Sequence, residues 1–229
     1  MPERHEISEG RRLLGNCPLF VGLSTDERAA IAARARIRTV PAGEMVFAIG
    51  SPGDEMMALL TGTIRISVPS PDGKELLLAM LKEGEVFGEL SVLDGKERSA
   101  DAVAETACTL AILDRRDVLS FFERNPSAWL KLVIVLCERM RRTDQIFAEV
   151  ALLELPSRLA KMMLRVTSGA GQSSRIRFSQ RELASMVGGT RESVNRCLRK
   201  WQSSFIIKVS EGAIVITNRG ALEAIAEQS

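Results

Sequence analysis

The sequence has few of the residues that most redox and metal centres require. It contains one histidine, His5, and four cysteines, none of which belongs to a C-x-x-C pair. An iron–sulfur sensor needs a cysteine cluster and a haem sensor usually needs a core histidine, so both classes are excluded. We therefore expect no metal in this protein, and we expect Cys17, Cys108, Cys137 and Cys197 to be reduced, mostly buried thiols.

Long apolar runs are also missing. No stretch of about 18 apolar residues occurs, and the N-terminus lacks the apolar core of a signal peptide. These absences predict a cytoplasmic protein with no membrane partner. The phosphate-binding sequence G-x-x-x-x-G-K-[ST] is absent, as is any recognisable nucleophile–base or metal constellation. We therefore expect neither a nucleoside triphosphatase nor another kind of enzyme.

The charges are unevenly distributed along the 229 residues. Residues 1–154 carry 19 basic and 24 acidic side chains, whereas residues 155–229 carry 12 basic and 5 acidic ones. A basic small domain that follows an acidic larger one suggests a nucleic-acid binder attached to a separate sensor. A merely solvated basic face is the alternative that charge alone leaves open.

One long helix is predicted near the middle of the chain, over residues 125–154. Asn125 is a good N-cap, Pro126 suits the first helical position, and no Gly or Pro follows before residue 156. Apolar side chains recur in steps of four and three, which is the spacing of a coiled-coil seam, and Thr143 interrupts them. We therefore expect a homodimer, with a buried monomeric helix as the alternative. The apolar seam residues are Trp129, Val133, Leu136, Met140, Phe147 and Val150.

The segment before this helix alternates short apolar runs with Gly and Pro breakers. Such closely spaced strands predict a small antiparallel barrel or roll, preceded by a helix that Ser24 caps. The fold class is thus α+β, with an N-terminal β-roll over residues 1–124, a dimerisation helix over 125–154 and a C-terminal domain over 155–229. The predicted strands are 37–40, 45–48, 56–60, 63–68, 75–81, 99–104 and 106–113.

Residues 84–100 do not form an ordinary turn. Gly88 permits close backbone approach, and the residues after it can start a short helix whose N–H groups point at an anion. Arg98 can grip a phosphate with two N–H groups, and Ser99 adds a hydroxyl donor. Because the Glu89 carboxylate would repel a bare phosphate, a sugar hydroxyl is its better partner. A single arginine suits one negative charge, and a Gly-flanked turn with a surface Arg–Glu pair is the plain alternative.

The C-terminal region has the spacing of a helix-turn-helix followed by a wing. Ser179 and Glu182 form a capping box for a helix over 181–187, and Thr190 caps a second helix over 191–202. Strands at 206–209 and 213–217 then form a hairpin. With the basic excess, this arrangement predicts DNA binding.

The sequence F-G-E-L followed by R-S-A resembles the phosphate-binding cassette of cyclic-nucleotide-binding domains. The likeness is to the CRP/FNR transcription regulators, in particular their cAMP receptor protein branch, and it extends over nearly the whole chain after residue 17. It implies that Gly88, Leu90, Ser99 and Arg98 bind the cyclic phosphate, while Glu89 binds the ribose 2′-hydroxyl.

The same resemblance implies further roles. A Thr-Ser pair on the long helix reaches the nucleobase in this family, and here it is Thr143 followed by Asp144. Asp144 stands where Ser is expected, and its carboxylate matches the paired donors of guanine, which makes cGMP the alternative. We favour cAMP, because the rest of the pocket follows the cAMP receptor protein branch.

The segment beginning at Thr190 resembles the family's recognition helix, so base edges would be read in half-sites of the type TGTGA…TCACA. Ser179, Arg181 and Ser193 are expected on phosphates. The residues expected to read bases are Arg191, Glu192 and Arg196.

The sequence thus predicts a dimeric regulator that binds an inverted-repeat operator and contacts RNA polymerase. A cyclic nucleotide would reset the long helices, and a hinge at 154–156 would re-aim the recognition helices. The alternatives are the same regulator responding to cGMP, cyclic di-GMP or no nucleotide, and a regulatory subunit of an enzyme.

Overall fold

The computed structural model describes residue 17 and residues 24–70, 75–167, 175–176, 178–210 and 213–228. Its internal contacts divide the chain into two compact units. One comprises Met1–Val68 and Leu78–Met140, and the other comprises Pro69–Leu77 and Arg141–Ser229.

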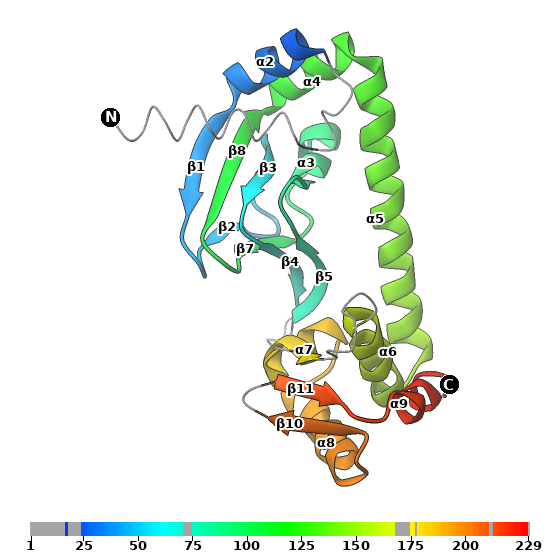
Figure 1. Ribbon diagram of the computed structural model, residues 1–229. Coiled ribbons are helices and arrows are strands. Elements are labelled where there is room, and N and C mark those ends of the chain that lie inside the picture. Colours follow the sequence, from blue (N-terminus) through cyan, green and yellow to red (C-terminus); the bar gives the residue numbers. More distant parts are fainter. Residues whose placement is uncertain are drawn as a thin grey trace. The chain divides into compact units, whose positions relative to one another are not determined.

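Two four-stranded sheets form the body of the N-terminal domain (Figure 1), with the strand orders β1-β8-β3-β6 and β2-β7-β4-β5. The pairs β1–β8, β3–β8, β3–β6, β2–β7 and β4–β7 are all antiparallel. This is the predicted antiparallel roll. The strands are β1 (Arg36–Val40), β2 (Met45–Phe47), β3 (Glu55–Thr61), β4 (Ile64–Pro69), β5 (Glu75–Leu81), β6 (Val86–Phe87), β7 (Asp101–Ala104) and β8 (Cys108–Asp114).

Strand β3 is buried on both faces, which explains why its sequence is apolar throughout instead of alternating. Met57 and Leu59 point into the roll, where they join a cluster that includes Phe87 and Leu110. Met56, Ala58 and Leu60 point to the opposite face and join a second cluster. Because successive strand side chains alternate in direction, one strand serves two cores.

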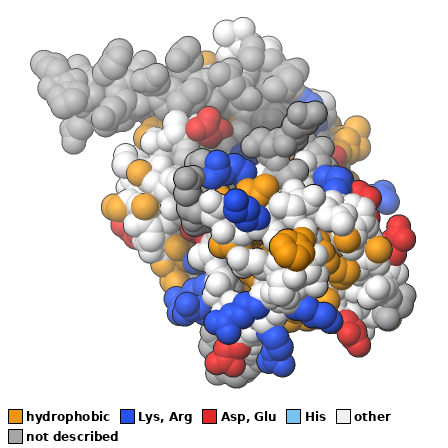
Figure 2. All heavy atoms as spheres, turned by 60° about the horizontal axis from the view of Figure 1, so that its bottom comes forward, with side chains coloured by type: hydrophobic (Ala, Val, Ile, Leu, Met, Phe, Trp, Pro, Cys, Tyr) orange, Lys and Arg blue, Asp and Glu red, His pale blue; other side chains and the backbone are white. Residues whose placement is uncertain are grey.

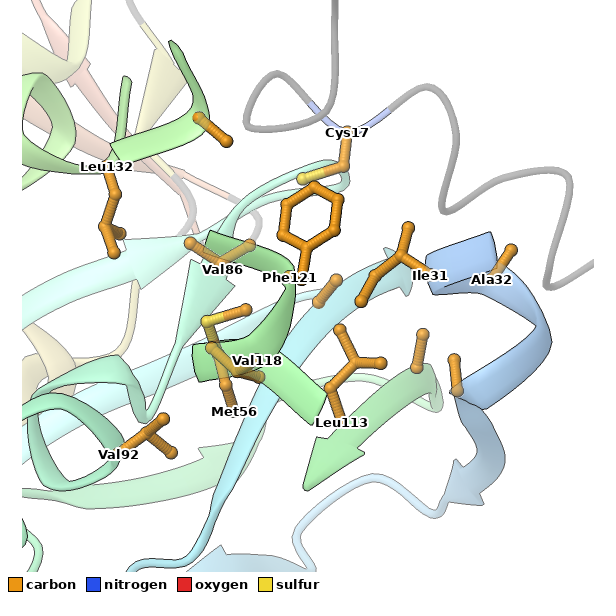
Figure 3. Close-up of a cluster of buried hydrophobic side chains, with 14 of the residues drawn as sticks. Cys17, Ile31, Ala32, Met56, Val86, Val92, Leu113, Val118, Phe121 and Leu132 are labelled. Atoms are coloured by element: carbon orange, nitrogen blue, oxygen red, sulfur yellow. The ribbon is translucent and has the colours of Figure 1, made fainter. Parts of the chain in front are cut away.

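The second cluster lies between the outer face of the β1-β8-β3-β6 sheet and a layer of helices. Figure 3 shows Leu113 of β8, Ile31 of α2 (Thr25–Arg34) and Phe121 of α4 (Arg115–Arg124) converging there. Cys17 is buried beside them, and its thiol donates to the carbonyl of Gly84 at 2.8 Å. Ser24 caps the start of α2 as predicted, and together with Glu27 it forms a capping box.

Helix α5 (Pro126–Leu152) is the predicted long helix, and Figure 1 shows it as one uninterrupted element. Asn125 lies directly before α5, and its side chain also serves the end of α4. Its side-chain amide donates to the Phe121 carbonyl at 2.8 Å, which satisfies an orphan carbonyl at the end of α4. Ala128 and Leu132 are fully buried and attach the first turns of α5 to the second cluster.

The C-terminal domain is a winged helix-turn-helix. Helices α6 (Leu155–Thr167), α7 (Gln180–Met186), α8 (Arg191–Ser203) and α9 (Arg219–Ala226) surround a core with Leu159, Leu183 and Trp201. Strands β9 (Arg175–Ile176), β10 (Ile207–Ser210) and β11 (Ala213–Ile216) form a sheet in the order β10-β11-β9, and β10 and β11 are the predicted wing.

The predicted α+β fold class is confirmed in both domains. The predictions from sequence did not include α4, α9 or the two-residue strands β6 and β9. Among the residues that the structure describes, no helix is long and apolar enough to cross a membrane.

Candidate functional site

Gly88 occupies a position that only glycine can fill. It links β6 to the short helix α3 (Glu89–Asp94) with φ of +74°, in the left-handed region. A Cβ atom at this residue would lie 2.5 Å from Nη1 of Arg98 and 3.2 Å from the Glu55 carbonyl. The absence of a side chain therefore lets Arg98 approach the backbone between β6 and α3.

Arg98 is buried beneath this turn, with 5% of its surface exposed. Its Nη1 and Nη2 donate to the carbonyls of Gly88 and Glu55, both at 2.8 Å. The guanidinium carbon lies 4.3 Å from the ring centroid of Phe47, a favourable cation–π distance. These contacts fix the guanidinium in one orientation.

The charge of Arg98 is not neutralised by a direct ion pair. Among the described residues no carboxylate lies within ion-pair distance of it, and its Nε is buried without a hydrogen-bond partner. Burial lowers the pKa of Arg98, while the nearby carboxylates of Glu55, Glu89 and Asp54 act in the opposite direction. Because arginine stays protonated in proteins, the site presents a buried positive charge that suits an anion.

A second close approach lies beside the guanidinium. A Cβ at Gly53 would be 2.2 Å from Cβ of Ser91 and 3.1 Å from Nε of Arg98. Loop 51–54 therefore packs directly on α3 and on the arginine. Sequence reasoning missed Gly53, because its turn neighbourhood looks like ordinary loop punctuation.

Glu89 lies on the other side of Gly88 and is 3% exposed. Its Oε1 accepts a hydrogen bond from Nη1 of Arg139 at 2.7 Å, and Nη2 of Arg139 donates to the Val86 carbonyl. Arg139 comes from α5, 50 residues away in the sequence. It was missed by sequence reasoning, although it precedes Thr143 by four residues and so shares a face of the helix with it.

The other predicted pocket residues lie at the surface. Leu90 and Ser99 are exposed next to Glu89 and Arg98 respectively. Thr143 and Asp144 are exposed on α5 beyond Arg139, and one helical turn separates Arg139 from Thr143.

The predicted seam residues do not all share one exposed face. Trp129 and Leu136 pack against the core of their own domain, and the Trp129 ring lies 4.6 Å from that of Phe122. Val133, Met140, Phe147 and Val150 are exposed. Leu130 and Cys137 are exposed as well, so the exposed apolar residues follow one another at intervals of three, four, three and seven along a shifted line, with Asp144 in the gap. This line comprises Leu130, Val133, Cys137, Met140 and Phe147.

In the C-terminal domain, the predicted helix starts are present. The Ser179–Glu182 capping box opens α7, and the Thr190 hydroxyl accepts from the Ser193 N–H at 3.1 Å to cap α8. Thr190 thus has a structural role, and its hydroxyl also lies 2.8 Å from that of Ser193.

Exposed side chains of α8 and α7 form the basic surface. Arg191, Glu192 and Arg196 are exposed on α8, and Arg181 is exposed on α7. Figure 2 shows Lys and Arg side chains gathered on the face of this domain that is turned toward the viewer.

A groove of about 510 Å³ separates α7, α8 and the wing. Arg181, Arg191 and Arg199 line it, and Nε2 of Gln180 lies 3.5 Å from Oδ1 of Asn195 across the two helices. Arg191, Asn195 and Arg199 follow one another at intervals of four, so helical spacing could have identified this face. Three guanidinium groups around one groove suit the phosphates of a nucleic-acid backbone.

Comparison with known proteins shows which family this chain belongs to. Residues 37–125 match the model of the cyclic nucleotide-binding domain, and residues 157–225 match that of the Crp-like helix-turn-helix domain. The cyclic AMP receptor protein of Thermus thermophilus is 32% identical over 210 residues, which cover 91% of this chain and 96% of that protein. The chain belongs to the CRP/FNR family of transcription regulators. It therefore carries a cyclic-nucleotide-binding domain and a DNA-binding helix-turn-helix.

Two further comparisons agree with this. The CRP-like cAMP-activated global transcriptional regulator of Mycobacterium tuberculosis is 29% identical over 212 residues, covering 90% of this chain and 95% of that one. The fold is also that of the c-di-GMP-responsive global regulator CLP of Xanthomonas campestris, with a TM-score of 0.78 at 22% identity, over 84% of this chain and 99% of that one. The Mycobacterium relative is named as a transcriptional regulator, and the Xanthomonas protein as a global regulator.

Proposed function

We propose that this chain is a homodimeric, cytoplasmic transcription regulator whose affinity for an inverted-repeat operator is controlled by a cyclic nucleotide, with cAMP favoured. The observation that carries the proposal is the buried, unneutralised guanidinium of Arg98. A buried charge without a direct counterion is costly, and an anionic ligand that pairs with it recovers that cost. A cyclic phosphate supplies one negative charge.

The residues around Arg98 suit the rest of such a ligand. The cyclic phosphate would pair with Arg98 and accept from Ser99, with the exposed Leu90 beside it. Glu89 would accept a hydrogen bond from the ribose 2′-hydroxyl. Arg139 holds the Glu89 carboxylate at 2.7 Å, so the acceptor is oriented before the ligand arrives. The same ion pair joins the pocket to α5.

The choice of base depends on Thr143 and Asp144. Thr143 lies one turn beyond Arg139 on α5 and can accept from the N6 amino group of adenine. The names of the Thermus and Mycobacterium relatives favour cAMP. Asp144 supports cGMP as a second candidate, because a carboxylate matches the N1–H and N2–H₂ donors of guanine.

The dimer would form along the exposed apolar line of α5. Five apolar side chains open to solvent over five helical turns are unusual for a monomeric surface helix, and their spacing matches a coiled coil. Two symmetric copies of α5 would bury them. Trp129 and Leu136, which face the domain core, would anchor each helix to its own subunit.

A two-fold dimer presents two copies of α8, so half-sites about one helical turn (roughly 34 Å) apart are expected. Arg191 and Arg196 suit guanine edges and Glu192 suits the cytosine amino group. Ser179, Arg181 and Ser193 would contact phosphates, together with Arg199 in the groove. RNA polymerase is the proposed further partner, because the chain belongs to a family of transcription regulators.

Calorimetric titration tests the pocket. Wild-type protein is titrated with cAMP, cGMP and cyclic di-GMP, and so are Arg98→Leu and the control Arg38→Leu, which alters an exposed arginine of the same domain. We expect cAMP to bind tightest, Arg98→Leu to lose on the order of a hundredfold in affinity and Arg38→Leu to bind normally. Unchanged binding by Arg98→Leu would show that the phosphate lies elsewhere.

A further inference from the structure

The connection between α5 and α6 is short and strongly braced. Only Leu153 and Glu154 separate the end of α5 at Leu152 from the start of α6 at Leu155. The last carbonyls of a helix have no partners within it, so such an elbow bends easily unless other groups satisfy them. Two arginines of α6 provide this bracing.

Arg158 caps the end of α5. Its Nη1 donates to the carbonyl of Val150 at 3.0 Å and to that of Leu153 at 2.9 Å. A positive charge at a helix C-terminus is also favoured by the helix dipole. The Arg158 Nε is buried, and burial lowers the pKa of this guanidinium while Glu149 acts in the opposite direction. The guanidinium is thus partly buried at the elbow.

Arg165 adds a second brace two turns along α6. Its Nη1 and Nη2 pair with Oε1 and Oε2 of Glu149 at 2.5 and 3.2 Å. The Glu149 side chain is 12% exposed and that of Arg165 is 45% exposed, so the carboxylate is shielded from water while the guanidinium is partly open to it. A bidentate contact fixes the angle between the guanidinium and the carboxylate as well as their distance.

We propose that Glu149 and Arg165 form a clamp that makes the last turns of α5 and the DNA-binding domain one rigid piece. The two are positioning residues, which transmit a nucleotide-induced change in α5 to α8. The proposal rests on the proposed function. It replaces the hinge predicted at Glu154–Pro156, and it agrees with the grouping of Arg141–Leu152 in the same compact unit as the DNA-binding domain.

The test compares Glu149→Gln, Arg165→Gln and the conservative Arg165→Lys with Glu223→Gln, which breaks the exposed Arg219–Glu223 pair of α9 in the same domain. Operator affinity is measured by fluorescence anisotropy with and without cAMP, and cAMP affinity by calorimetry. Coupling between sites typically amounts to 5–150-fold. We expect both Gln variants to lose most of the ratio between operator affinity with cAMP and operator affinity without it. Their affinity for cAMP itself should stay within about twofold of wild type. Arg165→Lys should keep much of the ratio, and Glu223→Gln should keep all of it.

Hydrogen exchange provides a readout that needs no ligand. Amides of residues 150–158 should exchange at least tenfold faster in Glu149→Gln and Arg165→Gln than in wild type or Glu223→Gln. A wild-type ratio and wild-type exchange in the Gln variants would overturn the clamp. If wild-type protein itself shows no cAMP effect on DNA while the exchange difference is present, the clamp holds and the proposed function fails.

Discussion

The ion pair between Glu89 and Arg139 should be the most sensitive polar contact of the nucleotide-binding domain. Glu89 is 3% exposed and Arg139 supplies its hydrogen bond at 2.7 Å. Removing one partner of a buried pair leaves a desolvated charge, which typically costs about 3–5 kcal/mol. Because Arg139 is itself 28% exposed, water can replace part of the lost contact, and about 2–3 kcal/mol is the expected loss for Arg139→Met.

The two tryptophans allow this loss to be assigned to one domain. Trp129 packs on the N-terminal core and Trp201 lies in the C-terminal core, so a Trp201→Phe background leaves Trp129 as the only tryptophan reporter. Urea denaturation followed by Trp129 fluorescence then measures the free energy of unfolding of the domain that contains the pair.

The double variant Glu89→Gln/Arg139→Met should be more stable than Arg139→Met alone, because a neutral amide is cheaper to bury than an unpaired carboxylate. The control is Arg38→Met, which breaks the exposed Arg38–Glu44 pair and should cost at most about 1 kcal/mol. An Arg139→Met variant no less stable than Arg38→Met would show that the Glu89–Arg139 pair does not stabilise the domain.

Four further outcomes are expected. Phe205 is 84% exposed with φ of +57°, so Phe205→Gly should stabilise the C-terminal domain by about 0.5–1 kcal/mol in urea, whereas a loss of stability would contradict the strain argument. Asp144→Ser should raise the ratio of cAMP to cGMP affinity in calorimetry, and an unaltered ratio would mean that Asp144 does not contact the base. Mild oxidation should form a disulfide between the exposed Cys137 residues of two chains, since facing residues of a coiled-coil seam can reach disulfide distance. A monomer band on a non-reducing gel would argue that the two α5 helices do not bring Cys137 together. In selection from random DNA, Glu192→Ala should lose about 1–3 kcal/mol of base preference at one base pair. Arg181→Ala should instead weaken the affinity for all sequences alike and flatten the dependence of affinity on salt. If Glu192→Ala keeps its base preference at every position, Glu192 does not contact a base as proposed.

Local signals in the sequence predicted the helix-turn-helix well. The capping boxes of Ser24 and Ser179 and the cap at Thr190 each depend on residues three apart, so they can be recognised without tertiary information. The apolar contact between α7 and α8 could also be predicted from the sequence, because Leu183, Val194 and Leu198 have helical spacing, and all three are buried.

Long-range contacts explain what the sequence could not predict. Arg139 meets Glu89 across 50 residues, and nothing in the neighbourhood of either one signals the other. The contacts of Trp129 and Leu136 with the core of their own domain could not be predicted either, because these side chains also fit a seam and only the tertiary structure shows what they pack on. The brace between Glu149 and Arg165 likewise depends on the angle between two helices.

We propose that a cyclic nucleotide at Arg98 controls DNA binding. The most direct measurement is the fluorescence anisotropy of a labelled duplex, with TGTGA and TCACA half-sites one helical turn apart, titrated with wild-type protein and Arg98→Leu in the presence and absence of cAMP. We predict that cAMP tightens binding by the wild type at least fivefold and leaves Arg98→Leu unchanged. Equal affinity of the wild type with and without cAMP, at concentrations where calorimetry shows the pocket filled, would contradict the claim.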